Sequence, residues 1–262
     1  MANKLGIVTL HGMGNQPTDY YKPLMSRIEQ RLGRGRGEML VKPVYYHQAM
    51  QANQESLWQR MSSAHDLDAV RVRQFMLHSF SDAVNIQDYR EPDSIGLRVS
   101  RCVHEQINAV TKALDDDGVF VVVAQSLGNQ VMSNYIWDIQ HERGLFAPGG
   151  ENVEAAMANL SKLRVWFSTG NNMPLFVSGL EQDKIHAIQR PNRDFEWWNF
   201  FDVDDALGWP LKPLNEQYHD RLSVRDLEVN TGFTLLSHNH YWKDADVLDP
   251  LCDTLMHILN DE

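Results

Sequence analysis

A single serine follows the most apolar stretch of the chain, VFVVVA at 119–124, and stands between small residues in the run AQSLG. If Ser126 is a nucleophile, it must lie on a sharp turn from a strand into a helix, where bulky neighbours would collide with either element. Ala124 and Gly128, two residues before and two after the serine, meet that demand. The run is a relaxed form of the GxSxG pattern and predicts nucleophilic catalysis; the alternative is a serine that caps the next helix.

The run HGMG at 11–14 directly follows a second apolar stretch and could supply the electrostatic part of the same chemistry. Acyl transfer needs two backbone N–H groups at the oxyanion that develops in the transition state. We expect one from Leu127, which follows the serine, and the other from Met13 in the glycine-rich run. The common phosphate-binding patterns, GxGxxG and the P-loop, are absent from the sequence, so the alternative for HGMG is a plain turn.

Serine becomes an effective nucleophile when a histidine accepts its proton and a carboxylate orients that histidine. The run DVDD follows a predicted strand, and the run SHNHYW precedes the last predicted helix. The candidate acids and bases in these runs are Asp202, Asp204, Asp205, His238 and His240. The same residue types, read as DxDD and HxH, also suit a divalent cation, so a metal-dependent hydrolase is a competing interpretation.

Apolar runs rich in β-branched residues alternate with amphipathic stretches along the chain. We predict strands at 5–10, 39–47, 119–124, 162–170 and 196–202. Helices are predicted at 20–32, within 48–88, and at 94–114, 128–140 and 244–260. Such alternation is typical of an α/β protein with a doubly wound, mostly parallel sheet flanked by helices. Because ligands bind beyond the carboxyl ends of such strands, we expect the serine, the aspartates and the histidines to converge there.

The composition argues against several other functions. The 262 residues carry a net charge of −11, and basic residues cluster only in the short run RLGRGRG, so no nucleic-acid binding is expected. The longest apolar run is far shorter than the roughly 20 residues of a membrane span, so no integral membrane association is expected. The N-terminal run lacks a signal-peptide pattern, and Cys102 and Cys252 form no disulfide framework. We therefore expect a cytoplasmic protein with free thiols, of an oligomeric state that the sequence leaves open.

These motifs together resemble the α/β-hydrolase superfamily, in particular its lipase- and esterase-like members. The resemblance runs through IVTLHGMGNQ, VVVAQSLGNQ, FFDVDDALGWPLKPL and LLSHNHYWKD, and so covers nearly the whole chain. It implies one α/β-hydrolase domain over residues 1–262, with a triad in the order Ser, Asp, His. Matching the residues after the last predicted strand to the family favours Asp205 as the acid, with Asp204 as the alternative. The arrangement SH-x-x-YW favours His238 over His240 as the base.

The stretch 48–93 is longer than a minimal α/β-hydrolase needs. Its apolar residues, among them Val72, Met76 and Phe80, follow helical spacing. The stretch could form a helical cap over the active site, which would screen substrates and exclude water; the alternative is that its helices cover the sheet. The predicted substrate pocket combines motif residues with aromatic side chains for an apolar acyl group. These residues are His11, Gly12, Gln125, Trp209 and Trp242, together with Phe176.

The sequence therefore predicts a serine hydrolase that uses no cofactor and no metal and acts on a small-molecule acyl ester. Ser126 would attack the acyl carbon, His238 would accept and return the proton, and Asp205 would orient His238. Thioesters, amides and lactones are alternative substrates. The competing interpretations are the metal-dependent hydrolase and a non-catalytic binding protein with the same fold.

Overall fold

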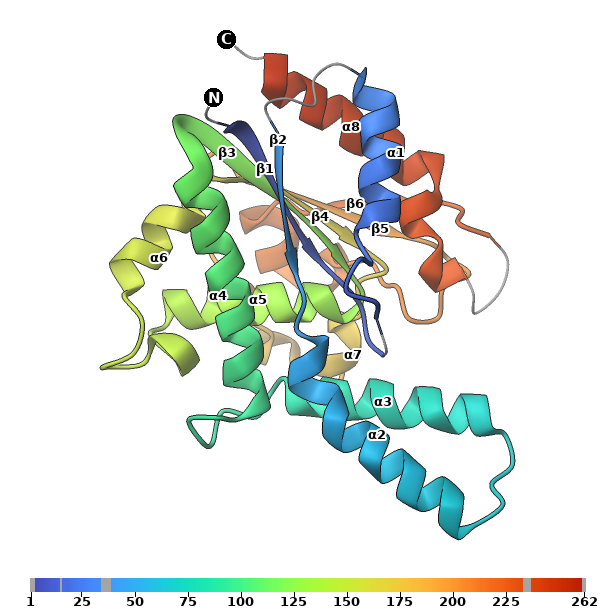
Figure 1. The fold of residues 1–262 in the computed structure, drawn as a ribbon. Helices are drawn as coiled ribbons and strands as arrows, with labels where there is room; N and C mark the ends of the chain where they lie inside the picture. The colour runs from blue at the N-terminus through green and yellow to red at the C-terminus, as the bar shows by residue number, and fades with distance from the viewer. Residues whose placement is uncertain (1–2, 15, 34–38, 233–236, 261–262) are drawn as a thin grey trace.

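A sheet of six parallel strands runs through the computed structural model, which describes residues 3–14, 16–33, 39–232 and 237–260 (Figure 1). The strands are β1 (Asn3–Leu10), β2 (Met39–Val44), β3 (Leu114–Gln125), β4 (Leu163–Thr169), β5 (Glu196–Phe201) and β6 (Arg225–Glu228). Their order is β2-β1-β3-β4-β5-β6, and every neighbouring pair is parallel. The chain reverses its direction of travel beside β1, and open α/β sheets bind ligands at such a point. This topology is that of the α/β-hydrolase fold and confirms the predicted fold class.

Helices cover both faces of the sheet (Figure 1). One face carries α1 (Lys22–Leu32) and α8 (Ala245–Asn260). The other carries α4 (Ile95–Ala113), α5 (Leu127–Gln140) and α6 (Val153–Leu160). The short α7 (Met173–Val177) follows β4. Because both faces are buried, the central strands read as continuous apolar runs rather than as alternating patterns.

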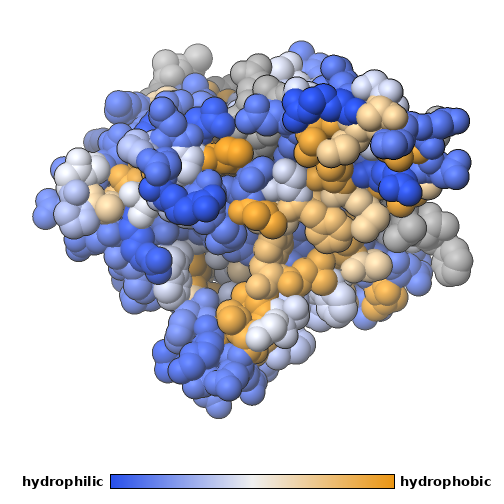
Figure 2. Space-filling view, turned by 90° about the horizontal axis from the view of Figure 1, so that it is seen from below, coloured by the Kyte–Doolittle hydropathy of each residue, from blue (hydrophilic) through white to orange (hydrophobic). Residues whose placement is uncertain are grey.

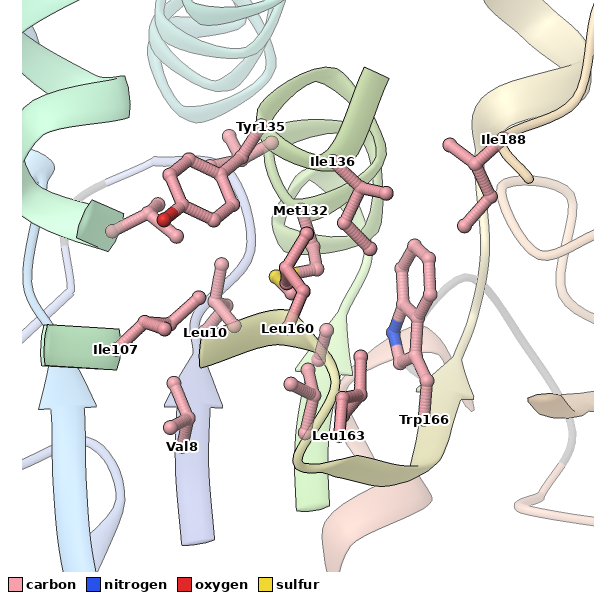
Figure 3. Close-up of a cluster of buried hydrophobic side chains, with 14 of the residues drawn as sticks. Val8, Leu10, Ile107, Met132, Tyr135, Ile136, Leu160, Leu163, Trp166 and Ile188 are labelled. Carbon is pink, nitrogen blue, oxygen red and sulfur yellow. The ribbon is translucent and has the colours of Figure 1, made fainter. Parts of the chain in front are cut away.

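The core is divided into two clusters by the sheet, since alternate residues of a strand point to opposite faces. Leu5 and Ile7 of β1 pack with side chains of α1 and α8, whereas Val8 and Leu10 pack with those of α4 and α5. Figure 3 shows part of the second cluster; its labelled side chains are Val8, Leu10, Ile107, Met132, Tyr135, Ile136, Leu160, Leu163, Trp166 and Ile188. These contacts hold α5, which follows Ser126, firmly on the sheet.

Several predicted elements have different ends in the structure. The strand predicted at 119–124 begins at Leu114, where Lys162 Nζ donates to the carbonyl oxygens of Asp115 and Asp116 at 2.9 and 2.8 Å. The strand predicted at 39–47 ends at Val44. Three further elements, α6, α7 and β6, are not predicted. β6 is a four-residue edge strand, RDLE, whose two charged end residues are exposed, so it lacks the apolar run that marks the other strands.

A hairpin of two helices, α2 (His47–Ala64) and α3 (Val70–Asn85), projects from the body of the molecule after β2 (Figure 1). It contains most of the stretch 48–93. The helix that packs on β1 and β2 is α4 rather than the hairpin. The hairpin contacts the loop after β1 through Asp82 of α3, whose Oδ2 accepts a hydrogen bond from the Gly14 N–H at 3.0 Å.

Gly128, the second residue of α5, sets how closely that helix approaches β1. A methyl group built on it would lie 2.7 Å from the carbonyl oxygen of His11 and 2.9 Å from that of Leu10. We expect Gly128→Ala to lower the free energy of unfolding by about 1–3 kcal/mol, because backbone atoms must move to make room. This loss should outweigh the better helix propensity of alanine. Urea denaturation followed by circular dichroism measures it.

Gly179→Ala is the matched control, because a methyl group built there meets no atom within 4 Å. Its free energy of unfolding should change by less than about 0.5 kcal/mol. Equal losses in the two variants would contradict the close approach of α5 to β1.

Candidate active site

Ser126 occupies the turn between β3 and α5 in a backbone conformation that few non-glycine residues adopt. Its φ and ψ angles are 53° and −123°, and strained positions of this kind cost about 1–3 kcal/mol. The Ser126 N–H donates to the Thr169 carbonyl oxygen at 3.0 Å, and the Asn129 N–H donates to the Ser126 carbonyl oxygen at 3.0 Å. The serine therefore lies on a tightly held strand-to-helix turn, the setting in which a nucleophile is exposed to substrate.

Buried polar side chains connect this turn to β4 and to the C-terminal part of the chain. Asn129 Nδ2 donates to the carbonyl oxygens of Ser126 and Thr169 at 3.1 and 3.2 Å. Thr169 Oγ1 donates to the Ala124 carbonyl oxygen at 3.1 Å and accepts a hydrogen bond from Trp242 Nε1 at 3.1 Å. Ala124, two residues before the serine, and Trp242, one of the two predicted pocket tryptophans, are thus joined through Thr169.

Asp205 and His238 come together from the loops after β5 and β6. His238 Nδ1 lies 2.8 Å from Asp205 Oδ2. The Tyr241 hydroxyl donates to the same oxygen at 2.8 Å, and the Leu207 N–H donates to Oδ1 at 3.0 Å. An ionised carboxylate only accepts hydrogen bonds, so His238 must carry its proton on Nδ1 and present Nε2 as a proton acceptor. Tyr241 has no role among the sequence-based predictions, although it belongs to the YW of SHNHYW.

The pKa of Asp205 is lowered by its surroundings. Burial alone would raise this pKa. The hydrogen bond and the charge of His238 lower it, as do the hydrogen bonds from the Leu207 N–H and the Tyr241 hydroxyl. Together they hold the pKa of this carboxyl below its ordinary value. An ionised Asp205 can stabilise the imidazolium that forms when His238 accepts a second proton.

The neighbouring aspartates and the second histidine have other partners. The buried Asp202 accepts hydrogen bonds from the N–H and the hydroxyl of Thr231 at 2.6 and 2.8 Å, and so ties the loop after β5 to the loop after β6. Asp204 is exposed, and His240 Nδ1 lies 3.2 Å from the Thr231 carbonyl oxygen. Neither Asp204 nor His240 takes part in the acid–base pair.

A pocket of about 290 Å³ opens beside Ser126. The residues that line it include His11, Gly12, Met13, Leu24, Gln125, Ser126, Leu207, His238 and Trp242. Trp209 lies outside this lining; its side chain is exposed, and its N–H donates to the Asn171 carbonyl oxygen at 2.9 Å. Phe176 lines a neighbouring groove instead. Ser126 and His238 therefore border one cavity together with four of the six predicted pocket residues.

Ser126 and His238 are neighbours in this pocket. Gln125, which precedes the serine, donates through Nε2 to the His238 carbonyl oxygen at 2.7 Å. Gly170 leaves room for the imidazole, since a methyl group built there would lie 3.0 Å from His238 Cε1. Within the described part of the chain, neither Ser126 Oγ nor His238 Nε2 has a hydrogen-bond partner. Both atoms are therefore free to bond to each other. A hydrogen bond between a nucleophile and its base is often long in the absence of substrate and shortens when substrate binds.

The loop after β1 lies directly against the serine. A methyl group on Gly12 would come within 3.1 Å of Ser126 Cβ, so this approach depends on the missing side chain. Two residues further on, Gly14 is fixed by its hydrogen bond to Asp82. Between these glycines lies Met13. Its N–H donates to no carbonyl or side chain among the described residues. The role of this N–H as an oxyanion donor stays a prediction.

Leu127, the second predicted donor, lies at the N-terminus of α5. Leu127 is the first residue of the helix, so its N–H has no acceptor within the helix. The helix dipole adds positive potential at the same end. The two predicted oxyanion donors thus come from elements on either side of Ser126.

His11 is a neutral side chain that helps to hold the loop after β1 in place. Burial lowers the pKa of His11 to about 3, which keeps the imidazole neutral near pH 7. Its Nδ1 lies 2.8 Å from the Gly12 carbonyl oxygen, and its ring stacks on that of Tyr46 at a centroid distance of 4.0 Å. The Tyr46 hydroxyl donates to the His11 carbonyl oxygen. A neutral, fully packed His11 is suited to fixing backbone geometry.

The DxDD and HxH residues do not converge on a common point. Asp202 is bonded to Thr231, whereas Asp205 is bonded to His238 and Tyr241. Among all described residues, no group of three or more histidine, cysteine or acidic side chains is placed to hold a metal ion. None of the described helices is long and apolar enough to cross a membrane.

Comparison with known proteins yields similar structures and no similar sequence: no family model and no curated protein matches the chain. A cutinase-like protein from Cryptococcus sp. has a TM-score of 0.46 and 10% identity, over 99% of this chain and 96% of its own. A protein from Xanthomonas campestris pv. campestris, described as a hydrolase of the alpha/beta superfamily, has a TM-score of 0.46 and 13% identity, over 97% and 99%. One from Klebsiella pneumoniae subsp. pneumoniae, described as a dienelactone hydrolase, has a TM-score of 0.47 and 10% identity, over 99% and 88%. Similarity at this level carries no information about a substrate.

The lowered pKa of Asp205 gives the stability of the protein a defined pH dependence. Such a carboxylate stabilises the fold above its unfolded pKa, about 3.9, and this contribution is lost as the pH falls through the folded value. We expect Asp205→Asn to be less stable than the wild type at pH 7 by about 1–3 kcal/mol. The difference should shrink as the pH falls below about 4, because the unfolded wild-type chain then binds a proton at Asp205 more readily than the folded protein does. Urea unfolding over a pH series measures it.

Asp204→Asn is the control for this experiment, because Asp204 is exposed and has no bond to His238. Its stability should follow that of the wild type at every pH. A loss in Asp205→Asn that stays constant from pH 7 to pH 3 would contradict the lowered pKa.

Proposed function

We propose that this chain is a serine hydrolase that cleaves carboxylic esters of small molecules through an acyl-enzyme. The observation that carries the proposal is the 2.8 Å contact between His238 Nδ1 and Asp205 Oδ2 at the pocket of Ser126. The chain order of the three residues is the one used by α/β-hydrolases. The competing role for the serine, as a cap of α5, is disfavoured because its side chain makes no capping hydrogen bond.

Acylation begins when His238 Nε2 accepts the hydroxyl proton of Ser126 and Oγ bonds to the acyl carbon. The carbonyl π electrons move to oxygen, and the N–H groups of Met13 and Leu127 stabilise that oxyanion. Asp205 stabilises the imidazolium. His238 then gives its proton to the leaving alcohol as the carbon–oxygen bond breaks, which leaves the acyl group on Ser126.

Deacylation repeats these steps with water as the nucleophile. His238 Nε2 accepts a proton from the water as its oxygen bonds to the acyl carbon. The second oxyanion forms at the same two N–H groups. When the bond to Ser126 Oγ breaks, His238 returns the proton to Oγ, and the carboxylic acid leaves.

The size and lining of the pocket support a small-molecule substrate. Its volume, about 290 Å³, is at the lower end of the range for ligand pockets. Met13, Leu24, Leu207 and Trp242 give it an apolar wall next to the serine. Such a wall suits an acyl group without charge.

The proposal is tested with a fluorophosphonate probe and an activated ester, p-nitrophenyl butyrate. We expect the probe to label the wild type and not Ser126→Ala. Ester hydrolysis should fall by at least about 10³-fold in Ser126→Ala and in His238→Gln, since each removes a member of the triad. His240→Gln is the matched control and should keep the wild-type rate.

Two outcomes would overturn the proposal. Hydrolysis that persists in Ser126→Ala would exclude the serine mechanism. A folded wild type that neither reacts with the probe nor hydrolyses butyrate, thioacetate, amide or lactone substrates would favour a binding protein with this fold.

Asp82 is expected to affect the rate of catalysis from outside the pocket. It is fully buried; Oδ2 accepts from the Gly14 N–H at 3.0 Å and Oδ1 from Gln54 Nε2 at 2.6 Å. The Asp82→Asn side chain offers one acceptor oxygen and cannot accept both bonds. Loss of the bond to Gly14 would loosen the loop that carries the Met13 N–H, the proposed oxyanion donor. Because the oxyanion forms only in the transition state, we expect kcat to fall about tenfold while KM changes less than about twofold.

Steady-state kinetics with p-nitrophenyl butyrate measure both constants. Asp66→Asn is the control, since Asp66 is exposed in the turn of the same hairpin. A rise in KM at constant kcat in Asp82→Asn would show that Asp82 acts on substrate binding and not on the oxyanion loop.

A further inference from the structure

Among the described side chains of helix α3, several polar ones are buried and a row of apolar ones is exposed. Its inward side carries polar residues, His78, Ser79 and Asp82, of which Asp82 is fully buried. Its outward side carries a row of apolar residues spaced four apart, a spacing that places them on one face. These residues are Val72, Met76, Phe80 and Val84, which are 59%, 47%, 64% and 70% exposed. A contiguous apolar row in water usually marks a binding surface.

An apolar groove runs between this row and α7. We call it the α3–α7 groove; it has a volume of about 360 Å³ and is lined by Met13, Met76, Ser79, Phe80, Ala83, Val84, Asn172, Leu175, Phe176 and Leu207. Eight of these ten residues are apolar. Leu175 on the α7 side is 45% exposed, so both walls present hydrophobic side chains to solvent. Figure 2 shows a broad hydrophobic band on the face of the molecule seen from below.

The groove adjoins the pocket at Ser126. Met13 and Leu207 line both. Met13 is the proposed oxyanion donor, and the Leu207 N–H donates to Asp205. These two side chains therefore lie where the catalytic pocket and the groove meet.

The apolar surface continues beyond the groove towards the turn of the hairpin. Met76 and Phe80 also border a shallow depression between α2 and α3, where they meet Trp58, Met61 and Leu77. Met76 and Phe80 thus border both the groove and the depression, so exposed apolar side chains extend along α3 beyond the groove. A short acyl group would leave most of this apolar surface in contact with water.

We propose that the α3–α7 groove binds the long aliphatic chain of the ester on which Ser126 acts. This inference rests on the proposed function and names its substrate class: long-chain aliphatic esters. Because Met13 and Leu207 line both the groove and the catalytic pocket, one molecule bound at Ser126 is the occupant that fits both, and we therefore assign the groove to part of the substrate. Transfer of each methylene from water to the groove can strengthen binding by up to about fourfold.

The test compares a variant inside the groove with one outside it on the same helix face. Val84→Asp places a carboxylate in the groove, and Leu175→Asp does so from the opposite wall. Val72→Asp is the matched control, because Val72 belongs to the same exposed row but lines neither the groove nor the depression. All three positions are exposed, and circular dichroism melts verify that each variant is folded.

Two ester series are measured below their micellar concentrations: p-nitrophenyl esters from butyrate to laurate, and alkyl acetates from butyl to dodecyl. We expect the wild type to prefer long chains in one of the series. The ratio of kcat/KM for the longest to the shortest member should fall at least about tenfold in Val84→Asp and Leu175→Asp. Val72→Asp should keep the wild-type ratio. Equal ratios in all four proteins would overturn the proposal.

Binding of sodium laurate to the Ser126→Ala protein, followed by calorimetry, separates this proposal from the catalytic one. Adding Val84→Asp should weaken binding at least about tenfold, and adding Val72→Asp should not. If laurate binding shows this pattern while the wild type has no esterase activity, the α3–α7 groove binds an aliphatic chain and only the proposed hydrolase function is wrong. If Val72→Asp weakens binding as much as Val84→Asp, or if sedimentation shows a dimer that either substitution dissociates, the row is a general docking face and the proposal is wrong.

Discussion

The strained turn at Ser126 is the constraint on which the rest of the structure depends. A serine with φ of 53° persists only where its surroundings determine it fully. Here β3 enters the turn from the middle of the sheet, and α5 leaves it packed on the apolar cluster of Figure 3. Thr169 and Asn129 bind the turn on both sides. The hydrophobic core therefore supports a conformation that the local sequence alone would not adopt.

The partners of the serine are positioned by buried polar contacts rather than by regular structure. Asp205 and His238 lie in loops, where backbone freedom would otherwise leave their distance undefined. Tyr241 donates to Asp205 and accepts from the Asp202 N–H, while Asp202 binds the loop that leads to His238 through Thr231. Buried polar groups are costly when unpaired. The network is therefore stable only as a whole, and its geometry is correspondingly specific.

The sequence predicts the parts that follow from local chemistry. Strands buried on both faces appear as apolar runs, and their order along the chain places the serine, the acid and the base at one end of the sheet. The preference for Asp205 over Asp204 came from the family resemblance, because both follow the same strand and neither type nor spacing separates them. Asp82 and Tyr241 were missed since their partners, Gly14 and Asp205, are 68 and 36 positions away along the chain. Hydrophobic periodicity does not report such pairs.

Periodicity also identifies α3 as amphipathic without telling which face is buried. The usual expectation places the apolar side against the core. In this molecule a polar residue of α3 is buried, since Asp82 accepts a hydrogen bond from the Gly14 N–H, and the apolar row is exposed. One rigid helix thus carries the wall of the groove on one side and the anchor of the oxyanion loop on the other. Any shift of α3 that alters the groove must also move Asp82, so the two features cannot vary independently.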